Sequence, residues 1–154
     1  MTHLAIFVAT AAYTGYFPIA PGTVGSLAGL LVYALVWWTG SALIESGTIL
    51  VLFGAGVWAG TKAERYFGGI DPGPVVIDEV VGMLVTMWLI PGGMATAAAG
   101  FMLFRIFDVV KPFPAKRLER LHGGLGVMAD DAMAAVYANL TLRLVLWVFP
   151  GVIA

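Results

Sequence analysis

The chain has 154 residues, of which 60% are hydrophobic, 11% are charged and none is cysteine, and its mean hydropathy is +0.95. These values lie far from those of a soluble domain and indicate one integral membrane domain over residues 1–154. The 8 basic residues nearly balance the 9 acidic ones, which excludes the basic surface of a nucleic-acid-binding protein. The chain start lacks the positive region of a signal peptide, so we expect the N-terminus to be retained.

Long apolar runs separated by turn residues predict an all-α polytopic membrane helix bundle of about five transmembrane helices. Residues 4–16 are too short to span a bilayer and lead into a stretch with two prolines, so we predict a short interfacial or re-entrant helix there. The predicted spans are residues 22–38, 48–66, 75–90, 94–110 and 127–149. A polar connection over residues 111–126 separates the last two spans.

The distribution of Lys and Arg predicts how these spans are oriented. The connections near residues 41–47 and 91–93 carry no basic residue, whereas the loops after the second and fourth spans carry Lys62, Arg65, Lys111, Lys116, Arg117 and Arg120. Basic loops remain on the cytoplasmic side of a membrane. We therefore predict that the N-terminal segment and the long polar loop face the cytoplasm.

Two acid doublets interrupt the apolar runs. Asp78 and Glu79 fall in the first turn of the third predicted span, and Asp130 and Asp131 in the first turn of the fifth. A carboxylate near the bilayer centre costs about 2.5 to 3.5 kcal/mol, so an acid there indicates function by default. Carboxylates at helix N-termini can also be ordinary interfacial polarity, stabilised by about 0.3 to 1 kcal/mol each. Two doublets at one depth favour a shared site, where a cation offsets their repulsion.

Other polar groups fall at the same predicted depth. Arg105, Asp108 and Lys111 recur every three residues at the end of the fourth span and so share one helix face. Ligands that are all oxygen atoms, in a chain without cysteine, indicate Mg²⁺ rather than zinc. The hydroxyls of Thr23 and Ser26 open the first span, where they either cradle a phosphate or belong to an N-cap whose glycines allow close helix contact, and spacing alone favours the second interpretation.

Four motifs occur along the chain in this order: GTVGS at residues 22–26, DEVVGM at 78–83, FRIFDVVKP at 104–112 and GGLGVMADD at 123–131. Their order and spacing resemble the phosphatidylglycerophosphatase A family over residues 13–140. The resemblance implies a Mg²⁺-dependent phosphatase of the bacterial inner (cytoplasmic) membrane, multi-pass and with its active site facing the cytoplasm. Its implied reaction removes the terminal phosphate of phosphatidylglycerophosphate to give phosphatidylglycerol in phospholipid biosynthesis.

The same resemblance implies roles for individual residues. The acids Asp78, Glu79, Asp130 and Asp131 resemble the catalytic and metal-binding set, with Asp108 beside them. For the substrate phosphate we assign Arg105, Lys111, Thr23 and Ser26, and Glu119 matches a further acid of the long loop. The implied partners are a phospholipid substrate and the membrane, with no nucleic acid, and the sequence leaves a homo-oligomer open. One departure is Ala135, where the family commonly has glycine.

Two other classes of membrane protein fit part of the pattern. A small acid-lined ion or metal transporter would place its acids near mid-bilayer on repeat-related helices, and the sequence shows no repeat. Another Mg²⁺-dependent lipid head-group enzyme, a CDP-alcohol phosphotransferase, would carry an Asp-Gly-x-x-Ala-Arg signature, which is missing. We therefore favour the phosphatase. Its nucleophile, an activated water or an aspartate, stays open at this stage.

Overall fold

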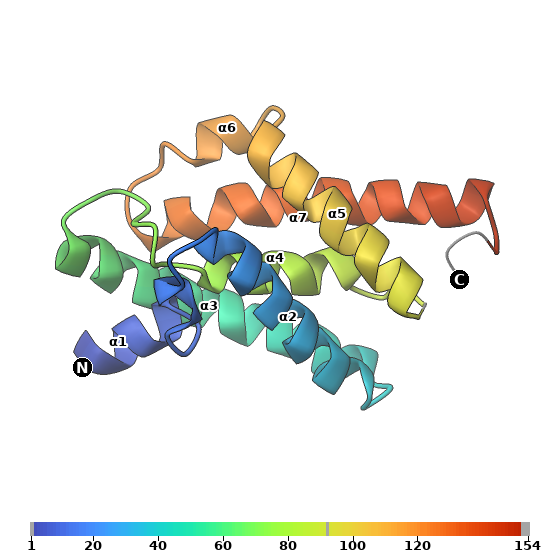
Figure 1. The fold of residues 1–154 in the computed structure, drawn as a ribbon, viewed down its shortest axis with the longest axis horizontal. Helices are drawn as coiled ribbons and strands as arrows, with labels where there is room; N and C mark the ends of the chain where they lie inside the picture. Colours follow the sequence, from blue (N-terminus) through green and yellow to red (C-terminus); the bar gives the residue numbers. More distant parts are fainter. Residues whose placement is uncertain (1, 92, 152–154) are drawn as a thin grey trace.

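The computed structural model describes residues 2–91 and 93–151. This part of the chain forms helices and no strand, which confirms the predicted all-α class. Figure 1 shows an elongated bundle with the last helix running along its long axis. The elements are α1 (Thr2–Ala9), η1 (Thr14–Tyr16), α2 (Pro21–Trp37), α3 (Ala42–Phe67), α4 (Ile77–Met87), α5 (Met94–Val110), α6 (Ala115–Leu118) and α7 (Gly124–Val148).

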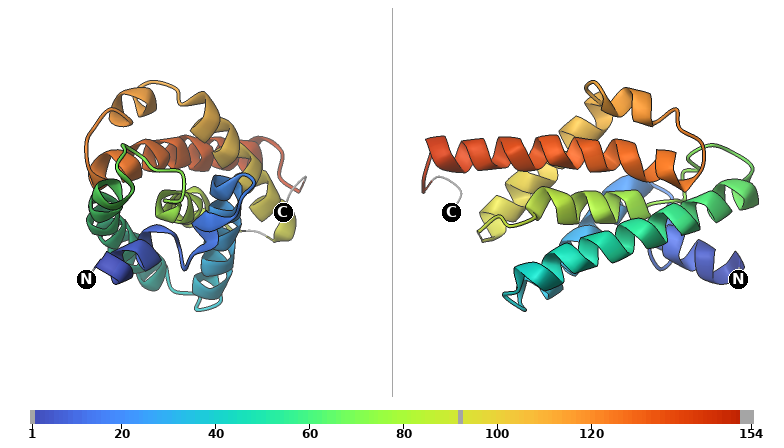
Figure 2. Two further views of the ribbon diagram at one scale, coloured as in Figure 1. Left: turned by 60° about the vertical axis from the view of Figure 1, so that its left-hand side comes forward. Right: turned by 180° about the vertical axis from the view of Figure 1, so that it is seen from behind.

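Helix α4 forms the centre of the bundle. It has 11 residues, and 9 of them are buried. It packs against α2, α3, α5 and α7, and the end-on view in Figure 2 shows it enclosed by its neighbours. The core has two hydrophobic clusters, and α4 contributes to each of them, with Val81 in one and Leu84 in the other. The helix that carries Asp78 and Glu79 in its first turn is therefore enclosed by the rest of the protein.

Glycines bring α2 close to α4. A Cβ atom added at Gly25 would lie 2.7 Å from Cβ of Val76, and one added at Gly29 would lie 2.9 Å from the carbonyl oxygen of Val80. Any side chain at these two positions would push the helices apart. The close-contact interpretation of the glycines in this stretch is thus confirmed. The N-cap that it included was wrong, because Ala20 precedes α2 and no side chain caps this helix start.

The prediction of about five transmembrane helices exceeds the number of helices that are long enough to span a membrane. Within the described residues, two helices are long and apolar enough to cross a membrane, Ala42–Phe67 and Gly124–Val148. Helices α2 and α5 have 17 residues each, only the lower limit of about 17 for a span whose usual length is about 20. The span predicted over residues 75–90 was wrong in length, because α4 ends at Met87 and Leu89 adopts a left-handed φ of 53°. The N-terminal helices α1 and η1 are too short to span, as predicted.

Two polar side chains of α7 form hydrogen bonds with the backbone carbonyl groups at the end of α4. The side-chain amide of Asn139 donates to the carbonyl oxygens of Thr86 and Trp88 at 2.9 and 3.1 Å. Arg143 donates from Nη2 to the carbonyl oxygens of Trp88 and Leu89 at 2.8 and 3.3 Å. The last carbonyls of a helix need such partners when no water reaches them. Both donors come from α7, so α7 allows α4 to end inside the bundle.

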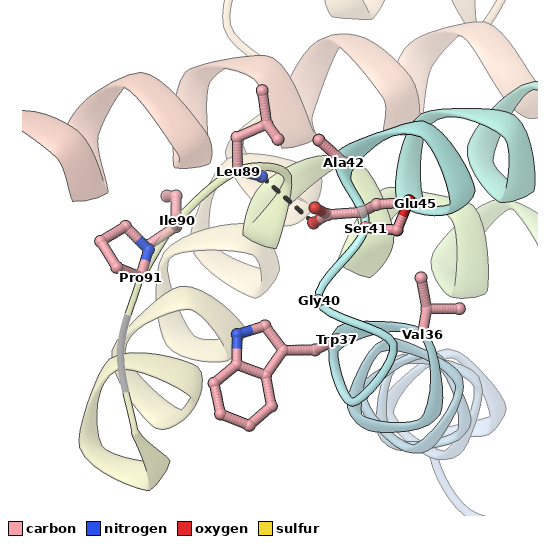
Figure 3. A pocket seen from close by; sticks show the side chains of 9 residues that line it. All are labelled: Val36, Trp37, Gly40, Ser41, Ala42, Glu45, Leu89, Ile90 and Pro91. Carbon is pink, nitrogen blue, oxygen red and sulfur yellow. Dashed lines mark hydrogen bonds between the residues drawn. The ribbon is translucent and has the colours of Figure 1, made fainter.

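A cavity of about 400 Å³ lies beside this end of α4. Figure 3 shows Glu45 reaching across it, where Oε1 accepts a hydrogen bond from the backbone N–H of Leu89 at 3.1 Å. Its lining includes one acid, Glu45, and mainly apolar residues of the connections around it. This cavity therefore lies at the opposite end of α4 from the acid doublet.

Candidate active site

A second cavity, of about 290 Å³, lies where the first turn of α4 meets the start of α2, the end of α5 and the first half of α7. Charged side chains make up 7 of its 12 lining residues. By contrast, three other cavities of the described chain have at most one charged lining residue, Glu45. The lining residues are Ala20, Pro21, Gly22, Asp71, Gly73, Val75, Asp78, Glu79, Arg105, Asp108, Lys111 and Asp131.

Three carboxylates meet at the bottom of this acidic cavity. Asp78, Glu79 and Asp131 each offer one oxygen atom, and these atoms lie within 4.8 Å of one another. Asp78 and Asp131 are only 6% and 3% exposed. Within the described chain, Oδ1 of Asp78, Oε2 of Glu79 and Oδ2 of Asp131 are buried without a hydrogen-bond partner. Buried acceptors of this kind are costly unless a donor or a cation satisfies them, so the three residues fit an oxygen-liganded metal ion.

The second acid doublet is divided between two partners. Helix α7 begins at Gly124 rather than at residue 127, so the predicted place of Asp130 and Asp131 in its first turn was wrong, and they lie one turn further along. Asp131 joins the three-carboxylate cluster, but Oδ2 of Asp130 lies 2.5 Å from Nζ of Lys111. The same ammonium lies 3.6 Å from Oε1 of Glu119. Lys111 is therefore held between two acids.

Arg105 is fixed at the side of the cavity. Its Nη1 atom lies 2.7 Å from Oδ2 of Asp108 and donates to Oγ of Ser26 at 3.5 Å. A Cβ atom at Gly22 would collide with the carboxylate of Glu79 and lie 3.3 Å from Nη1 of Arg105. Glycine at this position leaves room for the carboxylate of Glu79 beside the start of α2.

Neither hydroxyl residue of α2 that was assigned to the substrate phosphate, Thr23 or Ser26, lines the acidic cavity directly. Ser26 is buried, donates from Oγ to the carbonyl oxygen of Gly22 at 2.8 Å and reaches the cavity through Arg105. Thr23 is not among the residues that line the cavity. The start of α2 thus contributes mainly backbone and the space left by glycine.

Asp71 lines the cavity although sequence analysis did not select it. Asp71 as a whole residue is exposed, but partial burial of its carboxyl against the cavity, followed by the nearby charge of Asp130, raises the pKa of Asp71 to about 6. Burial alone would lower the pKa of the Lys111 ammonium. The hydrogen bond to Asp130 and its negative charge outweigh this effect and raise that pKa above its usual range. The available signal for Asp71 was an isolated acid in a Pro-Gly-Pro loop shortly before the doublet of α4.

Comparison with known proteins shows the family of this chain. Residues 7–146 match the family model described as Phosphatidylglycerophosphatase A. The chain belongs to the phosphatidylglycerophosphatase A family. This membership makes it an enzyme of the phosphatase class. No solved structure gives a significant match.

Curated relatives support membership of the phosphatidylglycerophosphatase A family. Phosphatidylglycerophosphatase A of Escherichia coli is 37% identical over 129 residues, which cover 80% of this chain and 72% of the relative. The Haemophilus influenzae protein of the same name is 36% identical over 131 residues, covering 84% and 80%. A Bacteroides thetaiotaomicron protein, provisionally named a phosphatidylinositol-3-phosphatase, is 37% identical over 157 aligned residues, covering 94% and 95%. All three relatives are bacterial.

Proposed function

We propose that this protein removes the terminal phosphate of phosphatidylglycerophosphate to give phosphatidylglycerol in phospholipid biosynthesis, with Mg²⁺ held in the acidic cavity. One observation carries the proposal: three carboxylates, each with a buried and unpartnered oxygen, share a cavity with a guanidinium and an ammonium. Phosphoryl transfer depends mainly on positioning and on neutralising charge. A cavity that holds a cation and two basic side chains together is suited to that task.

The metal ligands in this proposal are Asp78, Glu79 and Asp131. Their oxygens converge, and none of the three acids forms a salt bridge within the described chain that would compete with an ion. Mg²⁺ prefers oxygen ligands and needs only a few carboxylates, because it keeps several waters. When bound, it supplies positive charge beside a phosphate that carries up to two negative charges.

Two basic side chains bind the phosphate. Arg105 presents a planar guanidinium that can donate to two phosphate oxygens, and Asp108 holds it in place at 2.7 Å. Lys111 adds a second positive charge on the same face of α5, and Asp130 and Glu119 orient it. In this arrangement Asp108, Asp130 and Glu119 act by positioning the two phosphate ligands.

The proposed location is the bacterial inner membrane, with several membrane passes and the acidic cavity at the cytoplasmic face. Support comes from the bacterial relatives and from the basic residues near the cavity end of the bundle, which the positive-inside rule places in the cytoplasm. Helices α3 and α7 are each long and apolar enough to cross the membrane. Helices α2 and α5, with 17 residues each, reach the lower limit of a span, and α4 lies among them.

Phosphate release by the purified protein in detergent tests the proposed function. We expect turnover of phosphatidylglycerophosphate with Mg²⁺ and none after EDTA treatment, because the clustered carboxylates repel one another and the substrate without a cation. Full turnover in EDTA would contradict the metal site. The name of the Bacteroides relative supports phosphatidylinositol 3-phosphate as a second candidate substrate. If kcat/KM is higher for phosphatidylinositol 3-phosphate than for phosphatidylglycerophosphate, the former becomes the proposed substrate.

A further inference from the structure

Asp71 lines the acidic cavity without belonging to its carboxylate cluster. The oxygen atoms that converge within 4.8 Å come from Asp78, Glu79 and Asp131. Asp71 is an exposed residue, whereas Asp78 and Asp131 are almost completely buried. Its carboxylate therefore lies at the mouth of the cavity, above the cluster that we propose for the metal.

The backbone around Asp71 is held in a defined position. Asp71 has a left-handed φ of 47°, a conformation that residues other than glycine keep where the surrounding structure imposes it. Its N–H donates to Oε1 of Glu64 at 3.5 Å, and Oε2 of Glu64 accepts from the N–H of Gly123 at 2.9 Å. Glu64 thus joins the loop of Asp71 to the start of α7, the helix that carries Asp131.

A carboxylate at this place repels an anionic lipid unless the lipid offers it a hydrogen-bond donor. The proposed substrate has such a donor, because the glycerol between its two phosphates carries one free hydroxyl. With the terminal phosphate beside Arg105 and the metal ligands, this glycerol lies toward the mouth of the cavity. An ionised carboxylate is a strong acceptor for a hydroxyl.

We propose that Asp71 determines substrate specificity by accepting a hydrogen bond from the free hydroxyl of the head-group glycerol. This inference rests on the proposed function and adds the part of the substrate that the carboxylate recognises. A site that hydrogen-bonds a substrate hydroxyl discriminates against analogues that lack it.

The test compares two lipids that differ by one hydroxyl: phosphatidylglycerophosphate and its analogue with a propane-1,3-diol phosphate head group. We expect the wild-type protein to favour the natural head group about tenfold in kcat/KM, as for a hydrogen bond to a charged group. Asp71→Gly keeps the left-handed backbone without strain and removes only the carboxylate. This variant should lower kcat/KM for phosphatidylglycerophosphate about tenfold and leave kcat/KM for the analogue unchanged. Asp71→Asn, which retains an acceptor oxygen, should fall between.

The outcomes separate this inference from the proposed function. If Asp71→Gly lowers kcat/KM equally for both lipids, or lowers it for neither, the specificity role is overturned. A higher Mg²⁺ requirement in Asp71→Gly would also overturn it, because Asp71 would then be a metal ligand. A wild-type protein without preference would overturn it while leaving the phosphatase intact. Failure of the wild-type protein on both lipids would contradict the proposed function instead. Ile70→Ala, an exposed neighbour in the same loop, is the matched control and should change neither rate.

Discussion

The ammonium of Lys111 lies 2.5 Å from Oδ2 of Asp130, so two consecutive acids of α7 face different partners. Asp131, the next residue, shares the carboxylate cluster with Asp78 and Glu79. Lys111 caps the end of α5 with a left-handed φ of 44°, and its contact ties that end to α7. The doublet that forms one unit in the sequence thus has two separate sets of partners in the structure.

This division predicts different effects for the two acids of α7. Asp131→Asn should raise the Mg²⁺ concentration for half-maximal activity by at least about tenfold, because it removes a proposed ligand. Asp130→Asn should leave that concentration nearly unchanged and lower kcat/KM, because Lys111 loses its orientation. Phosphate release measured across a Mg²⁺ titration distinguishes the two effects. The same Mg²⁺ shift in both variants would show that both acids bind the metal.

A second prediction concerns Arg105. Arg105→Lys keeps the charge but loses the planar pair of donors, so kcat/KM should fall by at least about tenfold while the Mg²⁺ requirement stays the same. The matched control is Arg117→Lys on α6, because Arg117 is exposed and lies over the ring of Phe113 at 4.9 Å. Near-normal activity of Arg105→Lys would leave Lys111 as the main phosphate ligand.

A third prediction tests the contact between α2 and α4. Gly29→Ala should destabilise the protein by about 1 to 3 kcal/mol, because the added Cβ meets the backbone of Val80 and forces the helices apart. Gly54→Ala on α3 is the control, since a Cβ there meets nothing within 4 Å. It should be neutral or stabilise the helix by up to about 1 kcal/mol. Thermal unfolding of both variants in the same detergent measures the difference.

The parts of the site that follow helix periodicity could be predicted from the sequence. The bounds of α5 and the first-turn position of Asp78 and Glu79 agree with the prediction, because polar residues interrupt an otherwise apolar pattern there. The start of α7 could not be predicted. Its glycines resemble a loop in the sequence, but a Cβ at Gly124 would collide with the carbonyl group of Val57, so tertiary packing selects glycine inside a helix.

A fourth prediction tests the orientation. In intact cells, a membrane-impermeant thiol reagent applied from outside should label Thr39→Cys and should not label Arg117→Cys. Thr39 is exposed after the end of α2 that lies away from the acidic cavity, and Arg117 is exposed on α6 near the cavity. The protein has no cysteine of its own, so each variant carries a single target. The opposite labelling pattern would place the cavity outside the cytoplasm.

The burial of α4 also has a consequence for the order of synthesis. A helix of 11 residues with two acids in its first turn cannot enter a bilayer alone. The groups that complete it come from α7, the last helix of the described chain to leave the ribosome: Asp131 joins the acids at one end, and Asn139 and Arg143 bind the carbonyls at the other. Until α7 is made, the nascent chain therefore lacks one acid of the carboxylate cluster and the donors that bind the carbonyl groups at the end of α4.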